Sequence, residues 1–193
     1  AFPNGAGAYV GNAKLTDEDL AGLACCADLA YLDLSGNKIT DLSFVKDLPK
    51  LRLLSVANNK ITDLSALASL GELEFLEIFM NYVSDFTPLT GLTKLTHLNC
   101  ARTALADIAA LSGMKQLRML WLMNNKLEKE ALAKLAEALP ECTITSRGSN
   151  ATAGGWRTAE LYHEFEIKAG LAEPDPTPTP EPSPAEPSPT PGE

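Results

Sequence analysis

The feature that most constrains this chain is a leucine that returns every 22 residues over most of its length. The first position of each unit is occupied by Leu29, Leu51, Leu73, Leu95, Leu117 and Leu139. Further apolar residues follow each of these leucines three and five positions later, and follow the first five of them ten positions later as well. One such unit is too small to bury its own apolar edge, so neighbouring units must stack and share a core. The period therefore predicts a solenoid, and a coiled coil is excluded because its repeat is seven residues.

Each unit begins with an alternating apolar pattern, which predicts a short strand with one buried face. A polar residue follows eight positions after the leading leucine, where the chain must turn out of the strand; the residues are Asn37, Asn59, Asn81, Thr103 and Asn125. An asparagine side chain can bond backbone groups that a turn leaves unpaired, so stacked units should carry a ladder of asparagines. Thr103 should weaken or remodel one rung. The later apolar residues recur every three positions, which favours a 3-10 or irregular return.

An aspartate precedes an apolar residue at the start of each return segment, at Asp41, Asp63, Asp85 and Asp107. Two interpretations are open. The carboxylates could cap backbone N–H groups of the turn, which is the role we favour, or they could form a ladder of metal ligands. In the last unit Lys129-Glu130 replaces the pair, and leucines and alanines up to Pro140 predict a true α-helix.

The pattern L-x-x-L-x-L-x-x-N-x-I-x-D-L-x-x-L-x-x-L resembles the 22-residue leucine-rich repeats of bacterial internalin-like proteins, over about residues 20–145. The resemblance implies an α/β solenoid, a right-handed superhelix with a concave parallel sheet of about six strands. It also implies a 3-10 or irregular convex side and helical caps at both ends. Such a scaffold carries binding sites rather than a fixed chemistry.

The two ends of the chain depart from the repeat. Thr16 and the acids after it predict a helix N-terminus before the repeats. After them, Gly155-Trp156-Arg157 and Tyr162 resemble the tail that follows the last repeat in many leucine-rich proteins of Gram-positive anaerobes. It either covers the open end of the core, which we favour, or forms an aromatic ligand site. The segments expected are a flexible arm at 1–14, a capping helix at 15–28, repeats at 29–145, a capping segment at 146–172, and a Pro/Thr/Ser-rich disordered linker at 173–193.

The strand residues that point away from the core should line the concave face, and many of them are large and apolar. Exposed strand positions are normally polar, and a contiguous apolar patch usually marks a binding surface. The predicted partner-binding residues are Tyr31, Asp33, Phe75, Glu77, Phe79, His97, Asn99, Met119, Trp121 and Met123. The alternative is that the C-terminal tail or the N-terminal arm lies on this face and buries it.

The net charge and the absence of certain motifs disfavour several classes of partner and of chemistry. The net charge is −9, which disfavours nucleic acid and anionic membranes as partners. No apolar run is long enough for a membrane span, and no catalytic, metal or cofactor motif is present, so we expect neither an enzyme nor a cofactor. The cysteine spacing fits neither a zinc site nor a disulfide scaffold.

We expect a monomeric protein-binding module, secreted or displayed on a bacterial surface. The chain begins at Ala1 without an initiator methionine, which suggests a mature or trimmed form, and its Pro-rich end suggests that a further domain or an anchor follows. The alternative is a structural spacer or adaptor within a larger cell-surface protein whose active domain lies elsewhere.

Overall fold

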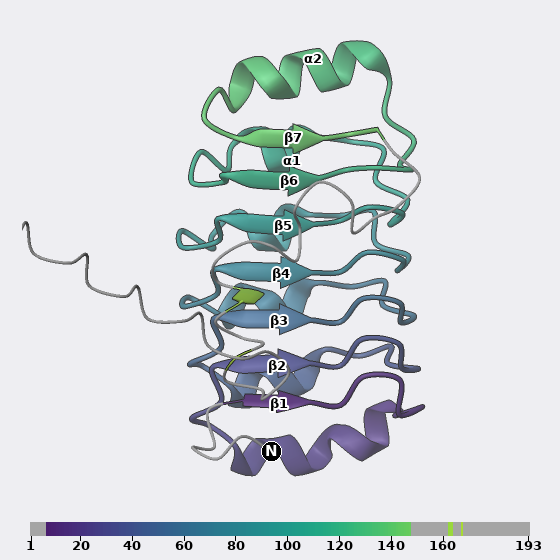
Figure 1. Ribbon diagram of the computed structural model, residues 1–193, viewed down its shortest axis with the longest axis vertical. Coiled ribbons are helices and arrows are strands. Elements are labelled where there is room, and N and C mark those ends of the chain that lie inside the picture. Colours follow the sequence, from purple (N-terminus) through teal and green to yellow (C-terminus); the bar gives the residue numbers. More distant parts are fainter. Residues whose placement is uncertain (1–6, 148–161, 164–166, 168–193) are drawn as a thin grey trace, which may run out of the picture.

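The computed structural model describes residues 7–147 together with Tyr162, His163 and Ile167. Its centre is one seven-stranded parallel sheet in which the strands follow each other in chain order (Figure 1). The strands are β1 (Gly7–Tyr9), β2 (Tyr31–Asp33), β3 (Leu53–Ser55), β4 (Phe75–Glu77), β5 (His97–Asn99), β6 (Met119–Trp121) and β7 (Thr143–Thr145). The predicted leucine-rich-repeat solenoid is confirmed.

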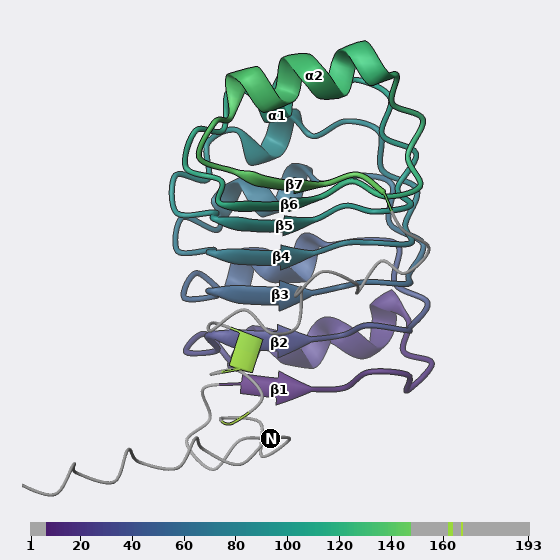
Figure 2. The ribbon, with the colours of Figure 1, turned by 45° about the horizontal axis from the view of Figure 1, so that its top comes forward.

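The return segments lie behind the sheet and form the convex side (Figure 2). They are short 3-10 helices in the early repeats, as the spacing of three between apolar residues predicted. The return helices are η2 (Ser43–Asp47), η3 (Ser65–Ser69), η4 (Thr87–Leu89), the one-turn α1 (Ala109–Ser112) and the longer α2 (Lys129–Ala138). The last of them is the α-helix predicted from the leucines and alanines before Pro140.

The strands pair in a register of 22 residues, so each side chain faces its counterpart in the next repeat. Leu32 pairs with Leu54, and Leu54 pairs with Leu76. All three are fully buried between the sheet and the return helices, in one continuous apolar core. Because each repeat contacts mainly its two neighbours, the core extends along the stack instead of around a centre.

The asparagine ladder forms as predicted. Asn59 Oδ1 accepts a hydrogen bond from the Ile39 N–H at 3.0 Å, and its Nδ2 donates to the carbonyls of Leu34 and Val56 at 3.0 Å each. Asn81 repeats this pattern one unit later. Each rung therefore satisfies backbone groups of its own repeat and of the preceding one, groups that would otherwise be buried without partners.

Thr103 remodels the fourth rung. Its hydroxyl donates to the Cys100 carbonyl at 2.8 Å, and Asn125 Nδ2 donates to the same carbonyl at 2.8 Å. Asn125 Oδ1 accepts from the N–H groups of Thr103 and Leu105. Asn125, in the next repeat, thus stabilises the turn at Thr103, because the threonine side chain is too short to reach the preceding repeat.

The repeated aspartates act as caps. Asp63 Oδ1 accepts from the Ser65 N–H at 2.8 Å and from its hydroxyl at 2.6 Å. Asp41, Asp85 and Asp107 each accept the equivalent N–H of the residue two positions on. Among the described residues, no group of three or more His, Cys, Asp or Glu side chains is placed to hold a metal ion.

The N-terminal arm is not loose throughout, which corrects the prediction for residues 1–14. Gly7–Tyr9 forms β1 and extends the sheet from about six strands to seven. The Val10 and Asn12 N–H groups then donate to Asp33 and Ser35 carbonyls, both at 2.8 Å. The small Gly and Ala side chains give no apolar pattern, yet the unpaired edge of β2 offers backbone partners to any extended segment.

The N-terminal cap is the 3-10 helix η1 (Asp17–Cys25), which lies below β1 in Figure 1. Asp19 Oδ2 accepts from the N–H of Thr16 at 2.8 Å and from its hydroxyl at 2.9 Å, which closes the first turn. The boundaries predicted for the C-terminal cap and linker lie outside the described residues, apart from Tyr162, His163 and Ile167. No helix in the described part of the chain is both long and apolar enough to cross a bilayer.

Candidate functional site

The ten predicted partner-binding residues lie on one face of the sheet, the concave face. Parallel register arranges them in lanes that run across the strands. Tyr31, Phe75, His97 and Met119 lie in the first lane with Leu53 between them, and this lane follows the paired residues of β2 to β6. The second lane contains Asp33, Ser55, Glu77, Asn99 and Trp121 in the same order. The third lane contains Phe79 and Met123, which lie two residues beyond the ends of β4 and β6.

These residues were expected to be exposed, and that expectation is wrong. Seven of the ten are buried: Tyr31, Asp33, Phe75, Glu77, Asn99, Trp121 and Met123. The others, Phe79, His97 and Met119, are half-buried. The apolar members form a second hydrophobic cluster on the far side of the sheet from the main core, and Tyr162 belongs to it.

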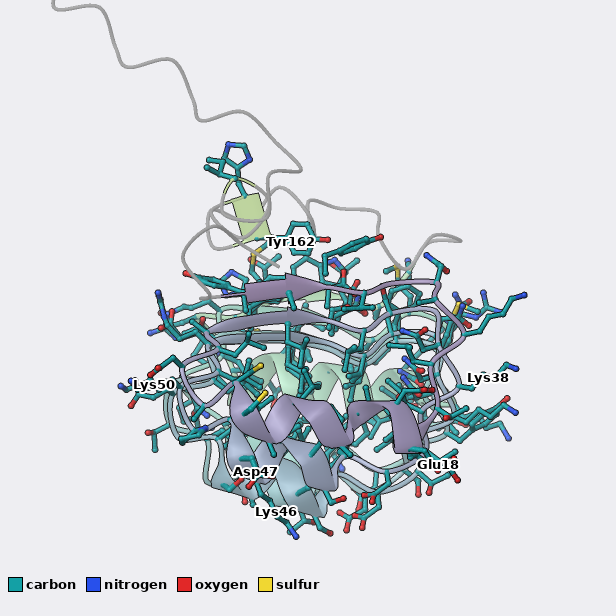
Figure 3. The ribbon with its side chains drawn as sticks, turned by 90° about the horizontal axis from the view of Figure 1, so that it is seen from below. Glu18, Lys38, Lys46, Asp47, Lys50 and Tyr162 are labelled. Atoms are coloured by element: carbon teal, nitrogen blue, oxygen red, sulfur yellow. The ribbon has the colours of Figure 1, made fainter. Side chains whose placement is uncertain are left out.

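Tyr162 accounts for part of this burial. Its side chain is 1% exposed, and its ring centroid lies 5.6 Å from that of Phe75 at a tilt of 43°. Figure 3 looks along the stack and places Tyr162 on the opposite side of the sheet from Lys46 and Asp47, which lie on the convex side. The alternative raised from the sequence, that a terminal segment lies on the concave face, therefore holds at Tyr162.

The first lane continues as a chain of aromatic contacts. The rings of Phe75 and His97 are stacked, with centroids 5.5 Å apart and planes 25° from parallel. At the other end of the lane, Arg52 donates from Nη1 to the Tyr31 hydroxyl at 3.2 Å. Arg52 is itself held by two bonds to the Glu74 carboxylate, at 2.7 and 3.2 Å. A bidentate pair of this kind fixes the guanidinium plane beside the aromatic ring.

The second lane is buried, and its members before Trp121 are polar. The Ser55 hydroxyl donates to Glu77 Oε2 at 2.5 Å, and Asn99 Oδ1 accepts from the Ala101 N–H at 3.2 Å. Asp33 Oδ1 accepts from the Ser35 N–H at 2.7 Å, while Asp33 Oδ2 has no hydrogen-bond partner within the described residues. Buried carboxylates are costly without compensation, and these hydrogen bonds to Glu77 and Asp33 offset part of that cost.

His97 is the half-buried imidazole of the first lane. Burial lowers the pKa of His97 from its ordinary 6.5, and the nearby Glu74 carboxylate opposes this only in part. Its Nδ1 lies 2.9 Å from the Thr96 hydroxyl, which also donates to the Glu74 carbonyl. The tautomer of the imidazole decides whether Nδ1 donates to this hydroxyl or accepts from it.

The cysteines add no reactive centre to the concave face. All four cysteines are free of disulfides, and the Sγ atoms of Cys25 and Cys26 lie 3.8 Å apart in a hydrogen bond. Burial raises the pKa of Cys100 far above its ordinary value and raises that of Cys142 to about 11. Such thiols are protonated at neutral pH and behave as small apolar side chains.

Two features of the surface were missed at the sequence level. The first is the position of Tyr162 on Phe75, which follows from no local pattern because 87 residues separate them. The second is a hollow of about 220 Å³ at the edge of the sheet, lined by Asn58, Asn59, Met80, Asn81, Tyr82 and Arg102. The sequence feature that could have indicated this hollow is Tyr82, because it is an aromatic residue at a position that the repeat pattern predicts to be exposed.

Comparison with known proteins matches residues 49–91 to a family model of leucine-rich repeats in two copies. A comparison of the sequence with curated proteins found no match. Among solved structures, an internalin (InlF) of Listeria monocytogenes is 35% identical with a TM-score of 0.57, and the match covers 68% of this chain and 40% of that one. A leucine-rich-repeat protein of Leptospira interrogans is 29% identical with a TM-score of 0.58, covering 63% of this chain and 32% of that one. Internalin C2 of Listeria monocytogenes is 25% identical with a TM-score of 0.55, covering 77% of this chain and 76% of that one.

Proposed function

Because this chain is a leucine-rich-repeat protein with internalin-like repeats, we propose that it works as a non-catalytic protein-binding module. Leucine-rich-repeat folds commonly serve protein–protein interaction. Their function lies in the residues displayed on the scaffold and not in the scaffold itself. The partner we propose is a protein, since a net charge of −9 repels nucleic acid.

The proposed site is the concave face, and its ligand is an extended segment that presents an aromatic side chain. The observation that carries this proposal is the burial of Tyr162 against Phe75. The face accepts one aromatic ring from a remote part of the chain, so its shape and chemistry suit an aromatic ligand. Tyrosine, tryptophan and methionine are also the residues enriched at the centres of protein interfaces.

An external ligand on this face must take the place of Tyr162. The half-buried residues Phe79, His97 and Met119 are the part of the face that such a ligand reaches first. The exchange would replace the apolar contacts of Tyr162 by contacts of similar size to the ligand. The net free energy of binding is therefore the difference between the free energies of these two sets of contacts. Binding is then selective for segments that pack at least as well as the chain's own residue.

The alternative is a spacer or adaptor in which the concave face stays closed by Tyr162. The same burial favours it, because a covered face needs no ligand. In either case we propose a secreted or surface-displayed bacterial location, by likeness to the internalins. The chain spans 40% and 32% of the first two structures it matches, so the activity and partners of those whole proteins are not transferred to it.

The test is binding in trans. A fluorescein-labelled synthetic peptide of residues 155–169 is titrated with full-length chains, and anisotropy reports binding. The Tyr162→Ala chain should bind the peptide at least about tenfold more tightly than the wild type, because its own ring no longer competes. Adding Phe79→Ala should weaken binding by about tenfold. Adding Lys46→Ala, which shortens an exposed side chain on the convex side, should leave binding of the peptide unchanged.

Circular dichroism melting verifies that each variant is folded. Failure of the Tyr162→Ala chain to bind the peptide, or binding that ignores Phe79, would refute the concave site and leave the spacer as the better proposal. If the peptide binds as expected, it then serves as a competitor. A protein partner that the Tyr162→Ala chain retains from extracts must be released when the peptide is added.

A further inference from the structure

In five repeats, the turn after the strand has a residue in the left-handed region at the same place, and the turn after β5 has a second one, Ala104. The five residues are Gly36 (φ +70°), Asn58 (+52°), Met80 (+56°), Arg102 (+54°) and Asn124 (+57°). Glycine and asparagine tolerate this conformation, whereas longer L-residues adopt it at a cost. Met80 and Arg102 are therefore the unusual members of the series, and the turn itself has no need of their side chains.

Met80 and Arg102 are neighbours in adjacent repeats, and both line the hollow at the strand-exit edge. In Figure 1 this edge is the one to which the strand arrows point. Tyr82, which is 67% exposed, lines the same hollow and is the more exposed of the two large apolar side chains at the described surface. An exposed tyrosine beside a methionine and an arginine combines the side chains most enriched in interface hot spots.

Of the polar side chains that line the hollow, those of Asn59 and Asn81 form hydrogen bonds within the protein. Asn59 and Asn81 use their amides in the ladder. Within the described residues, Arg102 and Asn58 have no side-chain hydrogen bond or ion pair, and no carboxylate lines the hollow.

The ion pairs found in the described residues all lie at the opposite edge, where the strands begin. They join Lys50 to Asp28, Arg52 to Glu74 and Lys94 to Glu72. Arg102 is thus an exposed cation held apart from the acids of a chain whose net charge is −9. A guanidinium without a partner favours a carboxylate ligand, which it can bind through two parallel hydrogen bonds.

We propose that this strand-exit hollow docks a protein segment that presents a carboxylate beside an apolar side chain. The carboxylate pairs with Arg102, the Asn58 amide donates to it, and the apolar side chain packs on Met80 and Tyr82. The volume of about 220 Å³ is below that of a typical small-molecule pocket and suits one or two side chains of a larger partner. The negative charge of the whole chain selects against polyanions, so a single acidic side chain is favoured over a nucleic acid.

This docking site is separate from the concave face, and either can fail without the other. The probe is the blocked peptide acetyl-Ala-Leu-Glu-Ala-amide, titrated into the ¹⁵N-labelled full chain and followed by amide chemical shifts. The expected result is a saturable shift of the amides of Asn58, Tyr82 and Arg102. The matched peptide with Gln in place of Glu should bind about tenfold more weakly, because it lacks the charge.

Two variants test the assigned residues. Arg102→Asn should weaken the Glu peptide to the level of the Gln peptide, and Lys126→Gln should leave its affinity unchanged, since Lys126 is exposed but lines no part of the hollow. Asparagine suits the left-handed turn, so Arg102→Asn should also raise the thermal midpoint by about 2–4 °C. Loss of binding in a more stable protein cannot come from unfolding.

Three results would overturn the proposal. The first is the absence of shifts at the hollow with the Glu peptide at millimolar concentration. The second is equal binding of the Glu and Gln peptides. The third is tighter binding of inorganic phosphate or of a dT oligonucleotide at the same amides, which would assign the hollow to phosphate and not to a protein carboxylate.

Discussion

The asparagine ladder makes a quantitative prediction at Asn81. This side chain is 3% exposed and bonds three buried backbone groups: the Ile61 N–H at 3.0 Å and the carbonyls of Val56 and Ile78 at 3.0 and 2.9 Å. Asn81→Ala removes all three bonds and leaves those groups out of reach of water. An unsatisfied buried backbone group costs about 1–3 kcal/mol, and the carbonyls keep part of their bonding through the second lone pair. We therefore expect a loss of about 3–5 kcal/mol in the free energy of unfolding.

That loss is large beside the roughly 5–15 kcal/mol that stabilises a typical domain. Urea denaturation of wild type and variant, with the slope compared to exclude a change in the unfolding mechanism, measures it. The control is Ser84→Ala, three residues further on and exposed, which should change stability by less than about 0.5 kcal/mol. A loss below about 1 kcal/mol for Asn81→Ala, or one matched by the control, would refute the idea that the ladder holds the turns.

Three further predictions follow from the same structure. Thr103→Asn should stabilise the chain by about 1–2 kcal/mol, because an amide can bond a carbonyl of the preceding repeat, as Asn81 does, whereas the hydroxyl bonds the Cys100 carbonyl and Asn125 Oδ1; urea denaturation measures the gain, and a destabilised variant would show that the rung is too tight for the larger side chain. Burial lowers the folded pKa of His97 below its ordinary 6.5, so the unfolded chain takes up its proton first and stability should fall as the pH drops below 6.5; comparison of denaturation curves with those of His97→Gln, which should lack this part of the decline, measures the effect. Iodoacetamide at about pH 8 should modify the exposed Cys25 first, Cys142 slowly and Cys100 only after unfolding, and rapid loss of the Cys100 thiol in the native chain, seen by peptide mass mapping, would contradict its burial.

The fold was predictable because its determinants are periodic and local. The leading leucines, the turn asparagines and the capping aspartates each repeat at 22 residues, and each acts within its own repeat or on the next one. The predicted strands and 3-10 returns follow directly from these spacings. β1 was missed because Gly7 and Ala8 pair through their backbones, which carry no signature in the sequence.

For the candidate site, the sequence predicted only which residues share one face of the sheet. The lanes of the concave face follow from the repeat register, so all ten residues could be assigned to one surface. Their burial could not be assigned, because it depends on Tyr162, a residue outside the repeat that contacts Phe75 across a long stretch of chain. Periodicity tells which side chains share a face, and it does not tell what covers that face.

The contact between Tyr162 and Phe75 has a consequence for how many repeats the chain can have. In a solenoid held only by neighbours, deletion of one 22-residue unit shortens the stack by one strand spacing, about 4.8 Å, and leaves every other contact in place. The second hydrophobic cluster links residues from β2 to β6 with Tyr162, which lies beyond the repeats. A gain or loss of one unit between Phe75 and β7 would move β7 by one strand spacing relative to Phe75, while Tyr162 packs on Phe75 itself. The contact therefore relates the number of repeats to the distance that the chain must cover between β7 and Tyr162.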